Sequence, residues 1–200
     1  MIMIEFLYLF LFRALSGAQN GFGYAKKSVY RVITSGLMVA VLAGSLFCWL
    51  QSAPESYWKA GTVILVIISI VGTIGVEDSF NPNYQILPKD IHLWEMLATG
   101  GITLAWMALG GNLISIAASI YPGLILHKGF INLGSGQKWW YAGTDDRTGK
   151  TFSIPLLNIK VPRLGTMGRI SIAVASVMAM IINTSLHWRI TVQDVIAWVL

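Results

Sequence analysis

The stretch from Leu93 to Leu126, LWEMLATGGITLAWMALGGNLISIAASIYPGLIL, decides the fold because it is nearly all apolar over 34 residues. A single helix of that length, at about 1.5 Å per residue, would be a rod of about 50 Å, against about 30 Å for the hydrocarbon core of a bilayer. Gly110, Gly111 and Asn112 lie at its middle and supply the backbone freedom that a tight reversal needs. We therefore expect a helical hairpin broken near 110–112, whose arms of about 16 residues either cross the membrane or form a re-entrant loop.

The composition places the whole chain in the membrane class. Of its 200 residues, 55% are hydrophobic and only 12% are charged, whereas soluble domains carry about 25% charged residues. The net charge of +5 does not indicate nucleic-acid binding, since the basic residues flank apolar segments, where they orient membrane proteins. The single cysteine, Cys48, excludes an intrachain disulfide.

Three further apolar runs complete the expected topology: Tyr30–Leu50, Ala60–Val76 and Arg169–Leu186. The sequence thus predicts an all-α integral membrane protein, a bundle of about five transmembrane helices or of three plus a re-entrant hairpin. We expect residues 1–28 to be an interfacial segment and a glycine-rich linker, because the apolar run Met1–Phe12 is too short to cross. Residues 29–127 then hold the membrane helices, and 169–200 the last helix with an amphipathic tail.

Residues 128–168 form the one sizeable extramembrane loop, which is basic and aromatic. Lys138–Ala142 and Thr151–Leu157 flank a turn-rich segment, which predicts a small β-hairpin. With the 93–126 hairpin, twelve Lys and Arg residues share this loop's side and only Lys59 and Arg189 face the other. Because short cytoplasmic loops are rich in Lys and Arg, we expect the N-terminus and this loop in the cytoplasm, at a bacterial inner membrane.

Small residues recur every fourth position on three of the expected spans. Such stripes let helix backbones approach closely, which is how membrane helices associate. They predict a packed bundle and favour an oligomer, with helix contacts at Gly36, Ala40 and Gly44; at Gly111, Ser115 and Ser119; and at Ala175 and Ala179.

Polar residues inside apolar spans are costly, so they are candidates for function. Glu95, Asn112 and Asn183 qualify, although snorkelling of Glu95 to the interface and an interhelical hydrogen bond from Asn183 are the plainer interpretations. The three histidines are scattered, and no motif for catalysis, a metal or a cofactor is found.

Three function classes follow. The first is a non-enzymatic scaffold that assembles with other membrane proteins through its loop, with candidate partner or lipid contacts at Lys138, Trp139, Trp140, Tyr141, Arg147 and Lys150. The second is an oligomeric channel, pore or small transporter subunit whose path is lined by Glu95, Asn112 and Asn183. The third is a lipid-processing enzyme that uses Asp145 and Asp146. The expected partners are the lipid bilayer, other membrane proteins and further copies of the chain, without nucleic acid.

Overall fold

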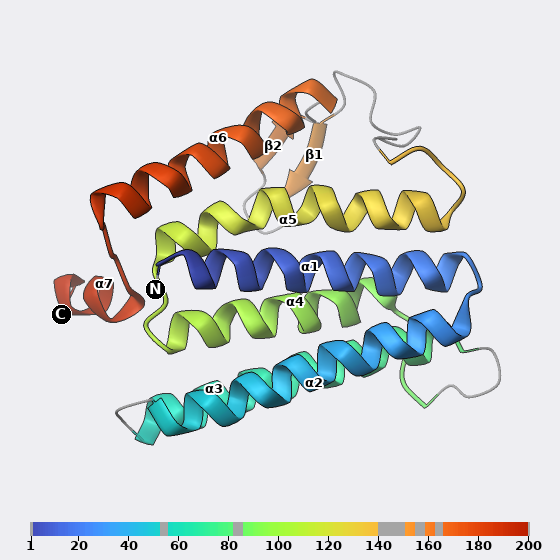
Figure 1. The fold of residues 1–200 in the computed structure, drawn as a ribbon, viewed down its shortest axis with the longest axis horizontal. Coiled ribbons are helices and arrows are strands. Elements are labelled where there is room, and N and C mark those ends of the chain that lie inside the picture. The colour runs from blue at the N-terminus through green and yellow to red at the C-terminus, as the bar shows by residue number, and fades with distance from the viewer. Residues whose placement is uncertain are drawn as a thin grey trace.

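The computed structural model describes residues 2–52, 56–81, 86–139, 151–154, 159–162 and 166–199. Within them the chain forms seven α-helices and one pair of short strands (Figure 1). The helices are α1 (Ile2–Tyr24), α2 (Ser28–Ser52), α3 (Ser56–Ser79), α4 (Ile91–Ala108), α5 (Leu113–Gly134), α6 (Thr166–Leu186) and α7 (Val192–Val199). The strands are β1 (Thr151–Ile154) and β2 (Ile159–Pro162).

Helix α1 lies at the centre of the bundle. It runs between α4 and α5, packs most closely against α5, and is also in contact with α2 (Figure 1). Consecutive helices α4 and α5 hardly touch each other, because α1 occupies the space between them. Leu9 and Phe12 of α1 are almost completely buried in the largest apolar core, together with residues from α2, α3, α4 and α5.

The prediction of an interfacial segment and a linker in residues 1–28 is wrong. One continuous helix runs from Ile2 to Tyr24, and its glycines serve close packing. A Cβ atom on Gly17 would fall on the backbone of His127, and one on Gly21 would fall on the carbonyl of Phe130. Because glycine has no Cβ, the α1 and α5 backbones touch here, which is a small-residue helix interface at four-residue spacing.

The break in the long apolar stretch falls at the glycines that the sequence singled out. Helix α4 ends at Ala108, and Gly110 adopts a φ of 77°, which favours glycine. The side chain of Asn112 then accepts a hydrogen bond from the backbone N–H of Ile114 at 3.0 Å and so caps the first turn of α5. Helices α4 and α5 lie on either side of α1, so they do not pack against each other as the two arms of a hairpin would.

The predicted β-hairpin is not supported. Its second arm, Thr151–Ile154, pairs antiparallel with Ile159–Pro162, where Phe152 faces Val161. The predicted partner strand 138–142 and its turn extend over residues 140–150, which lie outside the described residues. Among the described residues, β1 pairs only with β2, the segment that follows it in the chain.

The two ends of the bundle differ in what they contain. The N-terminus, the turn between α4 and α5, and α7 lie at one end; the α1–α2 turn and the C-terminal end of α5, near Lys138, lie at the other (Figure 1). Because α1 runs the length of the bundle, the N-terminus and Lys138 lie at opposite ends. The prediction that the N-terminus and the 128–168 loop share the cytoplasmic side stays a prediction, since most of that loop lies outside the described residues.

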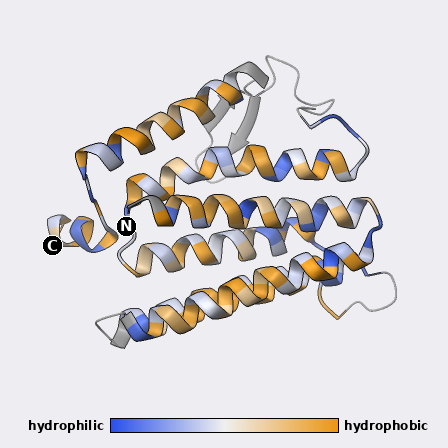
Figure 2. Cartoon of the chain, in the orientation of Figure 1, coloured by the Kyte–Doolittle hydropathy of each residue, from blue (hydrophilic) through white to orange (hydrophobic). Residues whose placement is uncertain are grey.

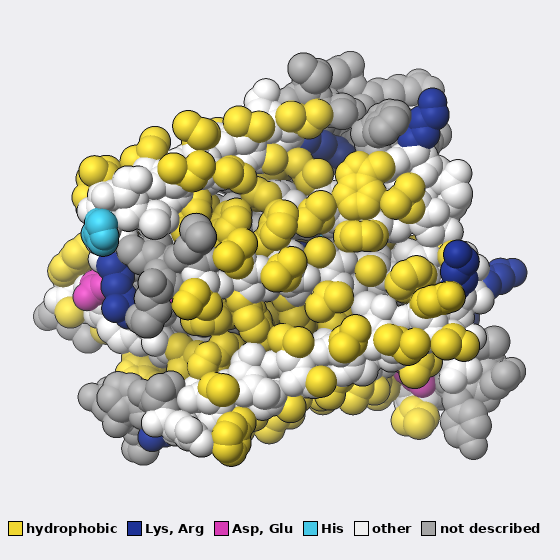
Figure 3. Space-filling view, viewed as in Figure 1, with side chains coloured by type: hydrophobic (Ala, Val, Ile, Leu, Met, Phe, Trp, Pro, Cys, Tyr) yellow, Lys and Arg dark blue, Asp and Glu magenta, His cyan; other side chains and the backbone are white. Residues whose placement is uncertain are grey.

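Four helices are long and apolar enough to cross a membrane: α2, α3, α5 and α6. Figure 2 shows long hydrophobic stretches along the helices, and on the face in Figure 3 hydrophobic side chains cover the middle of the bundle while Lys and Arg gather toward its ends. Exposed side chains such as Ile33, Leu37 and Ile64 suit lipid better than water. Helix α1 does not meet this criterion; its neighbours cover its polar face, while Ile4, Leu7 and Leu11 are exposed.

Candidate functional site

A cavity of about 220 Å³ lies where α1, α4 and α5 meet. It is lined by Arg13 from α1, by His92, Glu95, Met96 and Thr99 from α4, and by Leu124 and His127 from α5. Four of these seven side chains are ionisable, although the surrounding bundle is apolar. Charged groups inside such a bundle are costly and therefore mark a candidate site.

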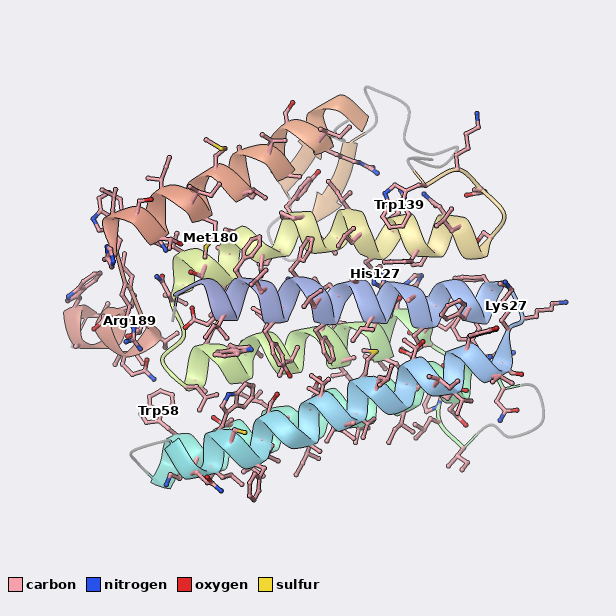
Figure 4. The ribbon with its side chains drawn as sticks, viewed as in Figure 1. Lys27, Trp58, His127, Trp139, Met180 and Arg189 are labelled. Atoms are coloured by element: carbon pink, nitrogen blue, oxygen red, sulfur yellow. The ribbon has the colours of Figure 1, made fainter. Side chains whose placement is uncertain are left out.

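Glu95 and His127 form the acidic part of the site. The Nε2 atom of His127 lies 3.1 Å from Oε1 of Glu95, and both side chains are largely buried, at 15% and 17% exposed. His127 lies between α5 and α1, where Gly17 leaves room for it (Figure 4). The Nδ1 atom of His92 is 3.5 Å from Oε2 of Glu95, on a side chain that is 92% exposed at the rim. Glu95 is thus held in the protein and does not snorkel.

Arg13 forms the basic part, at the midpoint of α1. The residue is only 8% exposed, and its aliphatic stem rests on Gly123 of α5. Its guanidinium donates to the hydroxyl of Ser119 at 3.4 Å and to that of Thr103 at 3.3 Å. Among the described residues no carboxylate lies within ion-pairing distance of Arg13. Its positive charge therefore contacts two hydroxyls and borders the cavity, and no described carboxylate neutralises it.

Polar residues continue from this cavity along the α1 contact surface. Helix α4 contributes Glu95, Thr99 and Thr103 at four-residue spacing, and α5 contributes His127, Ser119, Ser115 and Asn112. The hydroxyls of Ser115 and of Ser16 on α1 are buried and have no hydrogen-bond partner among the described residues. We call this set the polar seam; it follows α1 from His127 toward the opposite end of the bundle.

The far end of the polar seam is closed by the C-terminal tail. Glu5 is 4% exposed and accepts a hydrogen bond from the backbone of Asn112. The side-chain amide of Asn112 donates to the carbonyl of Trp188 at 2.7 Å, and the guanidinium of Arg189 donates to the carbonyl of Gly110 at 3.0 Å. Gln193 donates to the carbonyl of Ala108 at 3.0 Å. The tail thereby covers the α4–α5 turn.

A second polar network ties α1 to α2 and α3. The amide of Gln19, which is fully buried, donates to the hydroxyl of Ser35 at 2.8 Å and to the carbonyl of Thr73 at 3.0 Å. Ser35 also donates to Glu77 at 3.0 Å, and Glu77 pairs with Arg31 at 2.9 Å. These hydrogen bonds tie α1 to α2 and α3 and fix the helix register, although the side-chain oxygen of Gln19 has no partner among the described residues.

The other predicted polar and loop residues are dispersed. Asn183 on α6 is 2% exposed, and neither polar atom of its amide has a partner among the described residues, so the expected interhelical hydrogen bond is not present there. The ring of Trp139 packs on Gly129 and meets Phe130 edge-on (Figure 4), while Lys138 is exposed. Trp140, Tyr141, Arg147 and Lys150 lie outside the described residues.

The small-residue stripes divide between the interior and the surface. Gly111, Ser115 and Ser119 are buried, the last two on the face of α5 toward α1. Gly36, Ala40, Gly44, Ala175 and Ala179 are exposed, and nothing lies within 4 Å of a Cβ built on Gly36 or Gly44. Close backbone contacts between the described helices instead use Gly17, Gly21 and Gly134 between α1 and α5, and Gly72 and Gly101 between α3 and α4.

Arg13 and His127 are the site residues that sequence reasoning missed. Arg13 was placed next to an assumed linker, and His127 was set aside as one of three scattered histidines. The available signal was the spacing of Arg13, Gly17 and Gly21, which is helical and argues against a linker. Within the described residues no group of His, Cys, Asp or Glu side chains is arranged to hold a metal ion. Comparison with protein families, with curated proteins and with solved structures gives no match.

Proposed function

We propose that the chain is an integral membrane protein that passes a small ion or polar solute along the polar seam between α1, α4 and α5. The observation that carries this proposal is the gathering of Arg13, Glu95 and His127 around one cavity inside an otherwise apolar bundle. Residues of this kind inside membrane bundles face the interior and mark solute paths. A purely structural bundle would be at least as stable with apolar residues at these positions.

The charge distribution supports one orientation in the membrane. Lys26, Lys27, Lys89, Lys128 and Lys138 lie toward the end of the bundle where α1 ends and α2 begins, and Lys59 and Arg189 lie toward the other. The positive-inside rule then places the first end in the cytoplasm. Both termini lie outside in this orientation, which we propose for a bacterial inner membrane.

The scaffold function is the second candidate, and it is favoured by the outer face of α2. Exposed Gly36, Ala40 and Gly44 leave that face open to a helix of another chain or of a second copy. The loop anchors give it less support, because Trp139 already packs on α5. The lipid-processing activity gains no support, as Asp145 and Asp146 lie outside the described residues.

Flux through reconstituted vesicles tests the proposed function. The purified protein in liposomes should dissipate a salt or pH gradient faster than empty liposomes, and Glu95→Gln should lower the rate at least about tenfold, since it removes the charge that holds His127. His187→Asn is the matched control: His187 is exposed, and asparagine tolerates its φ of 55°. Flux at the level of empty liposomes, or an unchanged rate in Glu95→Gln, would contradict the proposal.

A further inference from the structure

We propose that the polar seam is selective for small anions and that Arg13 is the residue that binds them; this inference rests on the proposed function and names its substrate class. Arginine is charged at every physiological pH. At 8% exposure and without a carboxylate partner among the described residues, Arg13 keeps a full positive charge at the midpoint of α1. A fixed buried cation on the path attracts anions and repels cations.

The only acidic group at the cavity is already engaged. Glu95 has His127 at 3.1 Å and His92 at 3.5 Å, and it does not reach Arg13. The guanidinium of Arg13 is therefore the charged group at the cavity that no described residue engages as an ion pair, which suits an anionic ligand and disfavours a metal cation.

Hydroxyl donors that an anion needs lie near Arg13. Thr103 and Ser119 accept from the guanidinium and donate their own protons to the carbonyls of Thr99 and Ile116. The buried hydroxyls of Ser16 and Ser115, which have no partner among the described residues, lie one turn away on α1 and α5. Guanidinium and hydroxyl donors together replace the water around a small anion. An anion that leaves Arg13 could move along α5 from the hydroxyl on one helical turn to the hydroxyl on the next.

The cavity volume limits the size of the anion. About 220 Å³ corresponds to about seven water molecules at about 30 Å³ each. A halide, nitrate, formate or inorganic phosphate fits with part of its hydration, whereas a nucleotide does not. The phosphate of a lipid headgroup shares this chemistry, so the test separates it from a free anion.

Selectivity is measured on the full chain in vesicles of zwitterionic lipid. Under a potassium chloride gradient, the reversal potential should show that chloride passes at least about tenfold more readily than potassium. Arg13→Gln should abolish this preference, and Arg13→Lys should keep part of it because the charge is retained. Lys27→Gln is the control for loss of one positive charge: Lys27 lies exposed at the α1–α2 turn, outside the cavity and the polar seam, and its loss should leave the preference unchanged. Cation preference in the wild type, or chloride preference in Arg13→Gln, overturns the inference while the proposed function stands.

Binding is measured separately, so that the inference does not depend on flux. In mild detergent, chloride, nitrate or inorganic phosphate should raise the midpoint of thermal unfolding of the wild type, and the effect should be lost in Arg13→Gln. The pair Ser16→Ala with Ser115→Ala keeps the charge and removes the two unpartnered hydroxyls, so it should weaken the binding at least about tenfold even if Arg13→Gln folds poorly.

Two further outcomes are decisive. Arg13-dependent anion binding without any flux would support the anion site and refute the proposed function. If anionic phospholipid in the detergent micelles removes the effect of the free anions, the site holds a lipid headgroup and the small-anion substrate is overturned.

Discussion

Neighbouring glycines in α4 provide a direct test of the packing between α3 and α4. A Cβ atom on Gly101 would lie 2.8 Å from the carbonyl oxygen of Leu65 and 3.0 Å from the backbone nitrogen of Ser69. A Cβ atom on Gly100 would meet nothing within 4 Å. Gly101→Ala and Gly100→Ala therefore make the same chemical change one residue apart, and only the first places an atom against the backbone of α3.

The difference between the two variants can be estimated. Replacing glycine by alanine inside a helix contributes about 1 kcal/mol in favour of folding at both positions, so this gain cancels in the comparison. At Gly101 the Cβ needs about 0.6 Å more room to reach an ordinary contact of 3.4 Å, and overpacking of this kind costs about 1–3 kcal/mol. Gly101→Ala should thus be about 1–3 kcal/mol less stable than Gly100→Ala, or about 5- to 150-fold in the unfolding equilibrium.

Unfolding of both variants in mixed micelles, titrated with a denaturing detergent and followed by tryptophan fluorescence, measures that difference. Gly100→Ala should equal or exceed the wild type in stability. If Gly101→Ala is as stable as Gly100→Ala within about 0.5 kcal/mol, α3 and α4 do not approach each other at Leu65 and Ser69, and the packing described above is wrong.

Three further predictions concern the ends and the outer face of the bundle. Asp194 accepts hydrogen bonds from the hydroxyl and the backbone N–H of Thr191, at 2.7 and 2.8 Å, and these lower the pKa of Asp194. The two hydrogen bonds stabilise the start of α7 above the ordinary aspartate pKa, and this stability is lost as the pH falls through the lowered pKa. The protection of the α7 amides from exchange, relative to the unfolded chain at the same pH, should therefore fall only below about pH 4. In a Cys48→Ser background, Ser135→Cys should resist an impermeant thiol reagent in intact cells while a tag at the N-terminus is accessible from outside; the reverse pattern refutes the proposed orientation. Gly44→Leu should abolish any self-association in native gels without unfolding the chain, because nothing lies within 4 Å of that Cβ, and unchanged migration of an oligomer would exclude this face as its interface.

The sequence predicts the apolar helices well because a run of hydrophobic residues carries its own signal. The break at Gly110 and Gly111 and the run from Tyr30 to Leu50 could both be read from length and glycine content alone, and they agree with α4, α5 and α2. Helix α1 could not be read this way. Its polar residues and glycines resemble a linker when the local sequence is considered alone. They can lie in the interior because the neighbouring helices pack against them.

The candidate site was only partly predictable for the same reason. Glu95 could be predicted because a single acidic residue in an apolar run is recognisable without knowing which residues it contacts. Its pairing with His127, 32 positions later, depends on α1 holding α4 and α5 at a fixed separation, which no local pattern encodes. Lys138 is exposed, as its composition suggests, whereas the ring of Trp139 packs on Gly129 and Phe130, contacts that composition does not reveal.

The central position of α1 links the fold to the proposed function. Glu5, Arg13, Gln19 and Asn20 are each at most 8% exposed, and a helix with these residues would be costly against lipid. The amide nitrogen of Gln19 donates to α2 and α3 and so ties α1 to both helices. Arg13 makes only two long hydrogen bonds and borders a cavity, so a stabilising role in folding does not explain why an arginine occupies this position. The bundle buries the polar face of α1 and leaves Arg13 without a carboxylate partner among the described residues, and this is the arrangement from which we propose an anionic ligand.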